Sequence, residues 1–341
     1  MRRVTLIRHA HPDIPLGERW CLGLTDIPLG PVGRMQAALL PYDKELTGRP
    51  VFSSYLSRAV QTAQSLCSNP QIIDGLQEQD LGEWDGLPFS EIMVRWPELY
   101  AAREKDPDIW PESAETTESV RKRMIDAVLR CLEETDEDPI LVSHKSAIAS
   151  LTGQRPKLNH TTVSTMVWDG KELRPETIGR LPHPKLTEEV CLSLLHAAGT
   201  PEPVIAHCRA VARKVMQLLD GLEGSTTGPD LNRELLFSAA MLHDIARTEP
   251  DHAAVGAAWI RTLGYPETAE VIAQHHDFAG PERSEAALLY LADKYIQGET
   301  EVSLEERFTA SRKRCTTEEA LQAHNRRYET ALRIEKSLNR S

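Results

Sequence analysis

The segment Val4-Thr5-Leu6-Ile7-Arg8-His9-Ala10 joins a short apolar run to an arginine and a histidine. Residues 4–7 are typical of a buried β-strand. The two polar residues come directly after it, at the expected carboxyl end of the strand. Open α/β sheets bind their ligands at the carboxyl ends of strands, so this junction indicates where a site would lie.

Strand and helix signals alternate over the first half of the chain. Further short strands are expected at residues 50–52, 71–73, 139–142 and 162–168. Helical patterns begin at Arg34, Leu56 and Ser143. This alternation predicts an α/β domain with a mostly parallel sheet covered by helices.

Basic side chains recur where these strands end. Ser143-His144-Lys145 follows the strand at 139–142, and Arg58 lies early in the helix after the second strand. Together with Arg8-His9, they place two arginines and two histidines at one edge of the sheet. Arginine offers planar donors that suit phosphate oxygens, and a neutral imidazole can attack phosphorus. A carboxylic acid is needed to protonate the leaving oxygen, and Glu78, just after the third strand, is the candidate.

Five sequence blocks occur in a fixed order. They are Leu6–Ala10, Thr25–Leu29 with Gly33–Ala37, Ser54–Ala59 with Thr62–Ala63, Leu76–Glu78 with Leu81–Gly86, and Val142–His144. In this order they resemble the motifs of the histidine phosphatase superfamily, also called the phosphoglycerate mutase-like superfamily. The resemblance spans about residues 1–180. Ala10 replaces the glycine that is usual after the first histidine.

The resemblance assigns a role to each of these side chains. It implies that His9 is the nucleophile that becomes phosphohistidine and that Glu78 is the general acid. Arg8, Arg58 and His144 would bind the phosphate and stabilise the transferring phosphoryl group. Because basic groups supply the positive field, no metal or other cofactor is expected in this domain.

Residues 179–184 carry two prolines and are interpreted as a linker. The sequence pattern changes after this segment. Apolar residues then recur at helical spacing. Helices are expected at 186–198, 204–222, 234–246, 253–263, 267–275 and 285–295. The second half is therefore predicted to be an all-α domain, and the two domains are expected at residues 1–182 and 186–341.

Histidine and aspartate residues gather within these apolar helices. Imidazole and carboxylate together suit Mn, Fe, Ni, Co or Zn, and such groups are costly to bury unless they are paired or metal-bound. The candidate ligands are His207, His243, Asp244, His252, His275, His276 and Asp293.

The order of these ligands resembles the HD superfamily of metal-dependent phosphohydrolases, over about residues 186–300. The resemblance implies that His207, His243, Asp244 and Asp293 are the core ligands. His252 and His275, with His276 beside them, match the extra ligands of the two-metal subgroup. One or two divalent transition metal ions would activate a water molecule and polarise a phosphoryl oxygen.

Several other residues are given structural interpretations. His160, His183, His196 and His324 have no motif around them and are expected to be structural, and His11 is expected to point outward from a loop. Residues 96–124 resemble the variable cap of the phosphatase family, which would select the substrate. The basic runs at 312–314 and 326–327 are interpreted as solvated helix faces.

Composition excludes several classes of protein. The chain has 341 residues and a net charge of −12, which argues against a nucleic-acid-binding module. No apolar run approaches the roughly 18 residues of a membrane span, and no apolar segment of a secretory signal follows the basic start. Six cysteines without a CxxC pair are interpreted as reduced thiols of a cytoplasmic protein.

The sequence therefore predicts a bifunctional phosphohydrolase that acts on small phosphorylated metabolites or nucleotides, without nucleic-acid or membrane partners. The first half would be a metal-independent phosphomonoesterase, and the second half a metal-dependent phosphohydrolase with a nucleotide-type substrate. Two alternatives stay open. The HD domain could be a ligand-binding module that regulates a single active phosphatase, or the first half could be a non-catalytic phosphate-binding module of an active HD enzyme.

Overall fold

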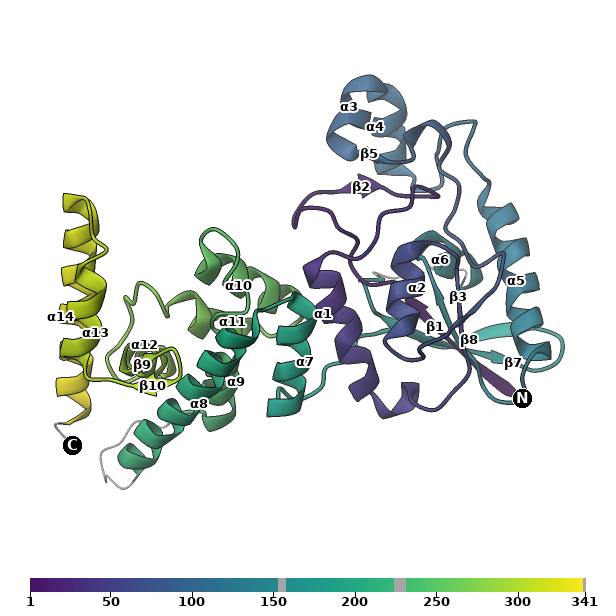
Figure 1. Ribbon diagram of the computed structural model, residues 1–341. Helices are drawn as coiled ribbons and strands as arrows, with labels where there is room; N and C mark the ends of the chain where they lie inside the picture. The colour runs from purple at the N-terminus through teal and green to yellow at the C-terminus, as the bar shows by residue number, and fades with distance from the viewer. Residues whose placement is uncertain (153–157, 224–230, 340–341) are drawn as a thin grey trace. The chain divides into compact units, whose positions relative to one another are not determined.

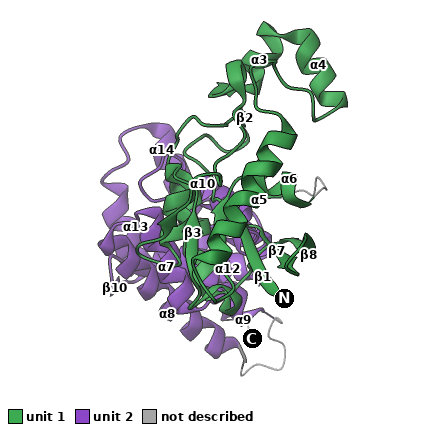
Figure 2. Cartoon of the chain, turned by 90° about the vertical axis from the view of Figure 1, so that its right-hand side faces the viewer, with its two compact units in different colours: residues 1–184 green, residues 185–341 purple. Residues whose placement is uncertain are grey.

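The computed structural model describes residues 1–152, 158–223 and 231–339. The chain forms two compact units, which are unit 1 (Met1–Pro184) and unit 2 (Lys185–Ser341) (Figures 1 and 2). Within the described residues, no helix combines the length and the apolar character that a membrane crossing requires.

A six-stranded sheet in the order β4-β3-β6-β1-β7-β8 lies at the centre of unit 1. Its strands are β1 (Arg2–Arg8), β3 (Val51–Ser53), β4 (Gln71–Ile72), β6 (Ile140–Ser143), β7 (Val163–Trp168) and β8 (Leu173–Arg180). The first four are mutually parallel, and β7 and β8 form an antiparallel hairpin at one side. The predicted α/β class is confirmed, but β8 was not predicted and takes in residues 179–180 of the expected linker.

Helices cover both faces of this sheet. They are α1 (Pro31–Leu39), α2 (Ser57–Gln64), α5 (Thr117–Glu133) and α6 (Lys145–Thr152), with short 3-10 turns η1 (Leu40–Tyr42) and η2 (Lys44–Leu46). Successive strand residues point to opposite faces, so Leu6 packs in one core cluster and Ile7 in another. Burial on both faces explains the continuous apolar runs that made these strands recognisable.

A segment of unit 1 that lies outside the sheet forms a small hydrophobic core of its own. It comprises β2 (Trp20–Cys21), η3 (Gly82–Trp84), β5 (Leu87–Pro88), α3 (Phe89–Arg95) and α4 (Pro97–Lys105). Trp84 is fully buried there, with Trp96 and Trp110 packed around it. Helices α3 and α4 project away from the sheet (Figure 1). The predicted cap at 96–124 is wrong for its last part, residues 117–124, because Val120 and Met124 of α5 belong to the core of the sheet.

Unit 2 is helical, as predicted. Its helices are α7 (Glu188–Ala198), α8 (Glu202–Glu223), α9 (Arg233–Leu242), α10 (His252–Thr262), α11 (Pro266–Ala273), α12 (Glu285–Tyr295), α13 (Leu304–Arg312) and α14 (Glu318–Leu338). Side chains that cap helix N-termini define several starts, because each accepts a hydrogen bond from a backbone N–H of the first turn. These caps are Thr187, Asn232, Ser284, Ser303 and Thr317.

Helix α12 is the centre of unit 2. Every residue from Ala286 to Lys294 is buried, and α8, α9, α11, α13 and α14 all pack against it. A short hairpin of β9 (Ile296–Gln297) and β10 (Thr300–Glu301), which was not predicted, follows directly. Asp293 and Lys294 therefore lie at the buried end of the central helix, where an isolated charge would be costly.

Candidate active site and candidate metal centre

His9 follows β1 directly and is almost completely buried. Its Nδ1 lies 2.7 Å from the carbonyl oxygen of Ala10. A carbonyl only accepts, so Nδ1 carries the ring proton and Nε2 keeps its lone pair. Burial, with help from the charges of Arg58 and Arg8, lowers the pKa of His9 well below its ordinary value. The ring is neutral at pH 7 and offers a nucleophilic nitrogen.

Arg58, on α2, is fully buried beside the same site. Its Nη1 and Nη2 donate to the carbonyls of Thr25 at 2.8 Å and Gly23 at 2.7 Å. Gly23 approaches the chain so closely that a Cβ there would lie 2.6 Å from the carbonyl oxygen of Gln79. The glycine thus brings its carbonyl to the guanidinium, which fixes the plane of that group.

Arg8 is held by residues of the loop before β7. Its Nη1 donates to the carbonyl of Leu158 at 2.6 Å, and its Nη2 lies 2.9 Å from Nε2 of His160. The ring of His160 lies 5.5 Å from that of His9 and 4.9 Å from that of His11. The structure therefore places both His160 and His11 at the site, and the structural and outward-loop interpretations of them are wrong. Neither histidine belongs to a recognisable motif, so the sequence did not indicate that it lies at the site.

His144 follows β6, and its ring centroid lies 4.9 Å from that of His9. Its Nε2 is 2.9 Å from Oγ of Ser54. That oxygen already accepts from the N–H of Leu56, so its hydroxyl hydrogen is free to bond with Nε2. This arrangement leaves the ring proton on Nδ1. Burial and the nearby His9 and arginine charges lower the pKa of His144 well below its ordinary value.

Three N–H donors of this site are buried without a partner among the described residues. They are Nε of Arg8, Nε of Arg58 and Nδ1 of His144. Each buried, unpaired donor costs about 1–3 kcal/mol. An anion with several oxygens would accept from all three, and phosphate is such an anion.

Glu78 is buried at the N-terminus of α6. Its Oε1 accepts from the N–H groups of Gln79 and Ala147, at 2.9 and 3.0 Å, and its Oε2 accepts from that of Ser146 at 3.1 Å. These three hydrogen bonds hold the carboxyl group in place. The charge of Glu78 also acts on Arg8 and Arg58. The structure thus brings Glu78 to the same site as His9.

Arg123 of α5 supports the loop that carries Glu78. Its guanidinium donates to the carbonyls of Gly75, Gln77 and Glu78, and it forms a 2.8 Å ion pair with Glu115. Glu115 lies within the region 96–124 that was predicted to be a cap, and its carboxylate fixes Arg123. Nothing in the sequence around Arg123 indicated this supporting role.

Ala10, in the place of the usual glycine, is not strained. It is absent from the residues with positive φ, and it is fully buried beside Leu29 and Ala37. Its N–H donates to Oγ1 of Thr62 at 2.9 Å. Alanine is therefore compatible with the backbone at this position.

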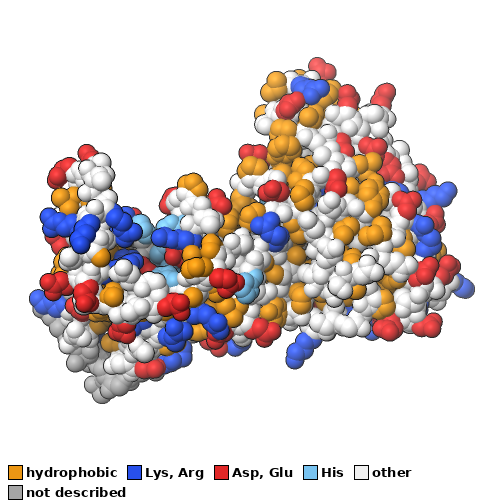
Figure 3. Space-filling view, viewed as in Figure 1, with side chains coloured by type: hydrophobic (Ala, Val, Ile, Leu, Met, Phe, Trp, Pro, Cys, Tyr) orange, Lys and Arg blue, Asp and Glu red, His pale blue; other side chains and the backbone are white. Residues whose placement is uncertain are grey.

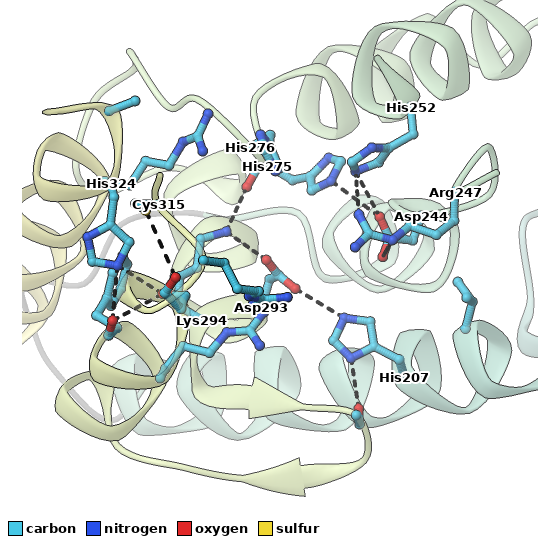
Figure 4. Close-up of a pocket in the computed structure, with 18 of the residues that line it drawn as sticks. His207, Asp244, Arg247, His252, His275, His276, Asp293, Lys294, Cys315 and His324 are labelled. Atoms are coloured by element: carbon cyan, nitrogen blue, oxygen red, sulfur yellow. Dashed lines mark hydrogen bonds and ion pairs between the residues drawn. The ribbon is translucent and has the colours of Figure 1, made fainter. Parts of the chain in front are cut away.

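Unit 2 brings six of the seven predicted ligands into two adjoining groups (Figure 4). The first is His207, His243 and Asp293, and the second is Asp244, His252 and His275. Within each group the donor atoms lie within 4.8 Å of one another. The elements that supply them are α8, the end of α9, the start of α10, the end of α11 and α12.

Asp244 connects the two groups through its two oxygens. Its Oδ2 lies 3.7 Å from Nε2 of His243, whereas its Oδ1 lies 3.2 Å from Nε2 of His252 and 3.5 Å from Nε2 of His275. On the other side, Oδ1 of Asp293 lies 3.1 Å from Nε2 of His207. A carboxylate with one oxygen toward each group is suited to bridge two cations.

The histidines of this centre are oriented by the main chain. Nδ1 donates at 2.8 Å to a backbone carbonyl in three cases, which are His207 to Gly298, His243 to Ala240, and His275 to Ile272. The Nε2 atoms point toward the carboxylates. Although burial lowers the pKa of His243, the carboxylate of Asp244 raises it well above its ordinary value, so a cation at this Nε2 would displace a proton. Such a second hydrogen bond is the usual way in which a protein fixes a metal-binding histidine.

Burial and charge also fit a cation at this centre. Within residues 158–223 and 231–339, Nε2 of His243 is buried with no hydrogen-bond partner. Although burial raises the pKa of Asp244, the neighbouring histidines hold it far below its usual range, and Lys294 and His207 do the same for Asp293. Both carboxylates are ionised, and the nitrogen and oxygen donors suit a divalent transition metal.

His276 lies outside both ligand groups. Its side chain is 43% exposed and its nearest carboxylate is Asp277, at 3.9 Å. The side chain of His276 lines the pocket beside the centre instead.

His324 links α13 to α14, since its Nε2 lies 3.0 Å from the carbonyl of Phe308 and 2.9 Å from Oγ of Ser311.

Three buried neutral histidines predict how the stability of unit 1 depends on pH. Burial and nearby arginine charge lower the pKa of His9, His144 and His160, whereas all three regain a pKa near 6.5 on unfolding. Below that pH the unfolded chain binds more protons, so stability falls as pH falls, by about 1.4 kcal/mol per pH unit for each histidine. Urea unfolding at pH 5–8 would measure this, followed by tryptophan fluorescence, because five of the six tryptophans lie in unit 1.

The matched variant for this prediction is His160→Gln. It removes one titrating ring, so the slope of stability against pH should fall by about 1.4 kcal/mol per pH unit. An unchanged slope would show that His160 titrates normally in the folded chain.

Comparisons with known proteins agree with this geometry. The histidine phosphatase superfamily (branch 1) matches residues 4–172, and the HD domain matches residues 204–297. The uncharacterized phosphatase PhoE of Bacillus subtilis is 29% identical over 47% of this chain and 83% of its own length. The glucosyl-3-phosphoglycerate phosphatase of Mycobacterium tuberculosis is 30% identical over 46% of this chain and 76% of its own length.

Among solved structures, a mycobacterial glucosyl-3-phosphoglycerate phosphatase aligns with a TM-score of 0.46 at 24% identity. The alignment covers 53% of this chain and 99% of that one. The family matches and the 30% identical relative together decide the assignment. The chain is therefore a phosphoric ester hydrolase that belongs to the histidine phosphatase superfamily, branch 1, and carries an HD domain.

Proposed function

We propose that the chain is a bifunctional phosphohydrolase with two separate centres. Unit 1 is a phosphomonoesterase that works through phosphohistidine at His9, and unit 2 is a metal-dependent phosphohydrolase. The observation that carries the first activity is the neutral His9, with a free Nε2, beside three buried donors that have no partner in the described part of the chain. Those donors belong to Arg8, Arg58 and His144.

In unit 1, Nε2 of His9 attacks the phosphorus atom of the ester. The new P–N bond forms as the bond between phosphorus and the ester oxygen breaks, and Glu78 gives a proton to that oxygen. The carboxylate of Glu78 then takes a proton from a water molecule that attacks the phosphohistidine. Orthophosphate leaves, and His9 and Glu78 return to their first states. Arg8, Arg58 and His144 donate to the oxygens of the transferring group, where negative charge is held.

In unit 2, the proposal rests on Asp244, whose two carboxylate oxygens lie toward histidines of different ligand groups. We infer that His207, His243 and Asp293 hold one divalent ion and that His252 and His275 hold a second, with Asp244 shared between them. Metal bound there would supply a water of lowered pKa and polarisation of a phosphoryl oxygen.

Neighbouring residues hold the ligands of this centre in place. Lys294 donates to Oδ2 of Asp293 at 2.7 Å and to the carbonyl of His275 at 3.2 Å. These bonds link α12 to the end of α11. They leave Oδ1 of Asp293 facing His207.

The two activities are expected to use small phosphorylated molecules. Unit 1 would take a phosphomonoester, and unit 2 a phosphate ester or anhydride of nucleotide type. Fusion in one chain suggests that the product of unit 2 is a substrate of unit 1. All six cysteines are free thiols in the structure, which supports a reducing compartment such as the cytoplasm.

Trapping of the covalent intermediate tests the role of His9. With p-nitrophenyl phosphate and an alkaline quench, the wild-type chain should show a phosphohistidine by mass spectrometry, and His9→Ala should show none. Glu78→Gln should accumulate it at least about tenfold, because p-nitrophenolate leaves without a proton whereas water still needs a base. His196→Ala, an exposed site in unit 2, is the control. Phosphohistidine that persists in His9→Ala would refute the assignment.

Metal content tests the second centre. After reconstitution with Mn²⁺ and desalting, elemental analysis should find about two ions per wild-type chain, one for each ligand group. Asp244→Asn should lose at least one ion, because it removes the charge shared by both groups. His276→Ala should keep both, since that side chain lies outside them. Full occupancy of Asp244→Asn would contradict the shared site.

A further inference from the structure

The candidate metal centre opens into a pocket of about 720 Å³ that has a second wall. This wall is formed by α13 and α14, which lie beyond the part of the chain that matches the HD domain. Figure 4 shows Cys315 and His324 on this wall, apart from the ligands. The wall residues that line the pocket are Arg307, Phe308, Ser311, Arg314, Cys315, Ala320, Ala323, His324 and Arg327.

These residues form one face of each helical segment. Arg307, Ser311 and Arg314 are spaced i, i+4 and i+7, and Ala320, Ala323 and Arg327 repeat the same helical period in α14. Phe308 is buried and packs on Tyr328, which holds the two helices together. Helical spacing therefore places Arg307 and Arg327 on the pocket side of α13 and α14, and Arg314 lines the pocket from the turn after α13.

The earlier interpretation of solvated basic faces is correct for only part of these runs. Arg314 and Arg327 line the pocket, whereas Arg312 and Arg326 do not, although Arg314 is itself exposed. Arg326 and Arg327 are adjacent on α14 and therefore point in different directions. One residue of a basic pair can thus line the pocket while its neighbour does not.

The pocket has an excess of positive charge in a chain whose net charge is −12. Its cations are Arg247, Lys294, Arg307, Arg314 and Arg327, and its only carboxylates among the described residues are Asp244 and Asp293. Both carboxylates are candidate metal ligands. Figure 3 shows histidines of unit 2 flanked by Lys and Arg side chains.

Most of these cations already have a carboxylate partner. Lys294 pairs with Asp293 at 2.7 Å, and Arg327 donates to both oxygens of Asp277. By contrast, no carboxylate of the described chain lies within 4.0 Å of the guanidinium of Arg307 or Arg314. The wall thus presents two arginines whose charge is not neutralised inside the pocket.

We propose that Arg307 and Arg314 bind a second phosphate of the substrate, one that is not cleaved. The substrates of unit 2 are then small molecules with at least two phosphate groups. Guanidinium groups suit phosphate oxygens, and both arginines line the same pocket. The volume suits a small ligand rather than a polymer. This inference rests on the proposed function of unit 2.

Binding of a non-hydrolysable probe tests the inference separately from catalysis. The probes are methylenediphosphonate, with two phosphonates, and methylphosphonate, with one. Calorimetric titration of the Mn²⁺-loaded full chain should show that Arg307→Ala and Arg314→Ala each weaken diphosphonate binding about tenfold. Methylphosphonate binding should not change. Unit 1 contributes equally to every sample, because none of the variants touches it.

Arg312→Ala is the matched control, since Arg312 lies on the same helix but outside the pocket. It should bind both probes as the wild type does. Arg314→Lys, which keeps the charge but loses the planar donors, should give an intermediate loss. Diphosphonate binding that is unchanged in the alanine variants, or equally weakened in Arg312→Ala, would overturn the inference. Absence of chelator-sensitive phosphate release with the binding pattern intact would instead refute the catalytic function of unit 2.

Discussion

Both centres depend on the same hydrogen bond, in which Nδ1–H of a histidine donates to a main-chain carbonyl. His9 does so to Ala10, and His207, His243 and His275 do so within unit 2. The bond fixes the ring orientation and turns Nε2 away from the main chain and toward the site. In the proposed mechanisms, this Nε2 is the nucleophile for phosphorus in unit 1 and a ligand for a cation in unit 2.

The groups around these Nε2 atoms differ in charge between the two units, and so does the charge of the ligand that each site can bind. Around His9, guanidinium and imidazole donors have no partner among the described residues, so the site suits an anion. Around His243 there are two ionised carboxylates and imidazole nitrogens, so the centre suits a cation. The same kind of histidine is thus suited to phosphoryl transfer in one unit and to metal binding in the other. This contrast is the physical basis of the two chemistries that we propose for the chain.

The parts of the fold that sequence predicts are those with a strong local signal. The buried strands before Arg8 and His144 are apolar on both faces, so their carboxyl ends and the residues that follow could be located. Strand β8 escaped prediction because most of its residues are exposed and polar. The hairpin of β9 and β10 is two residues long on each side and carries no period.

Prediction of the site residues from sequence likewise succeeds only where there is a local pattern. Ligands within motifs, such as His243 and Asp244, could be proposed from order alone. His160 and Arg123 act through contacts with Arg8 and with the Glu78 loop, which are distant in sequence and leave no local pattern. For Arg307 and Arg314, the sequence shows basic residues but not which helix face meets the pocket. That depends on how α13 and α14 pack on α12.

The central claim is that two independent phosphohydrolase centres share the chain. The most direct test measures phosphate release from a panel of phosphomonoesters and nucleotides by wild type, His9→Ala and Asp244→Asn, each with and without EDTA. We predict two sets of substrates. One is lost only in His9→Ala and survives EDTA, and the other is lost only in Asp244→Asn and with EDTA. If all release is abolished by EDTA and is unaffected by His9→Ala, unit 1 has no phosphatase activity and the account is contradicted.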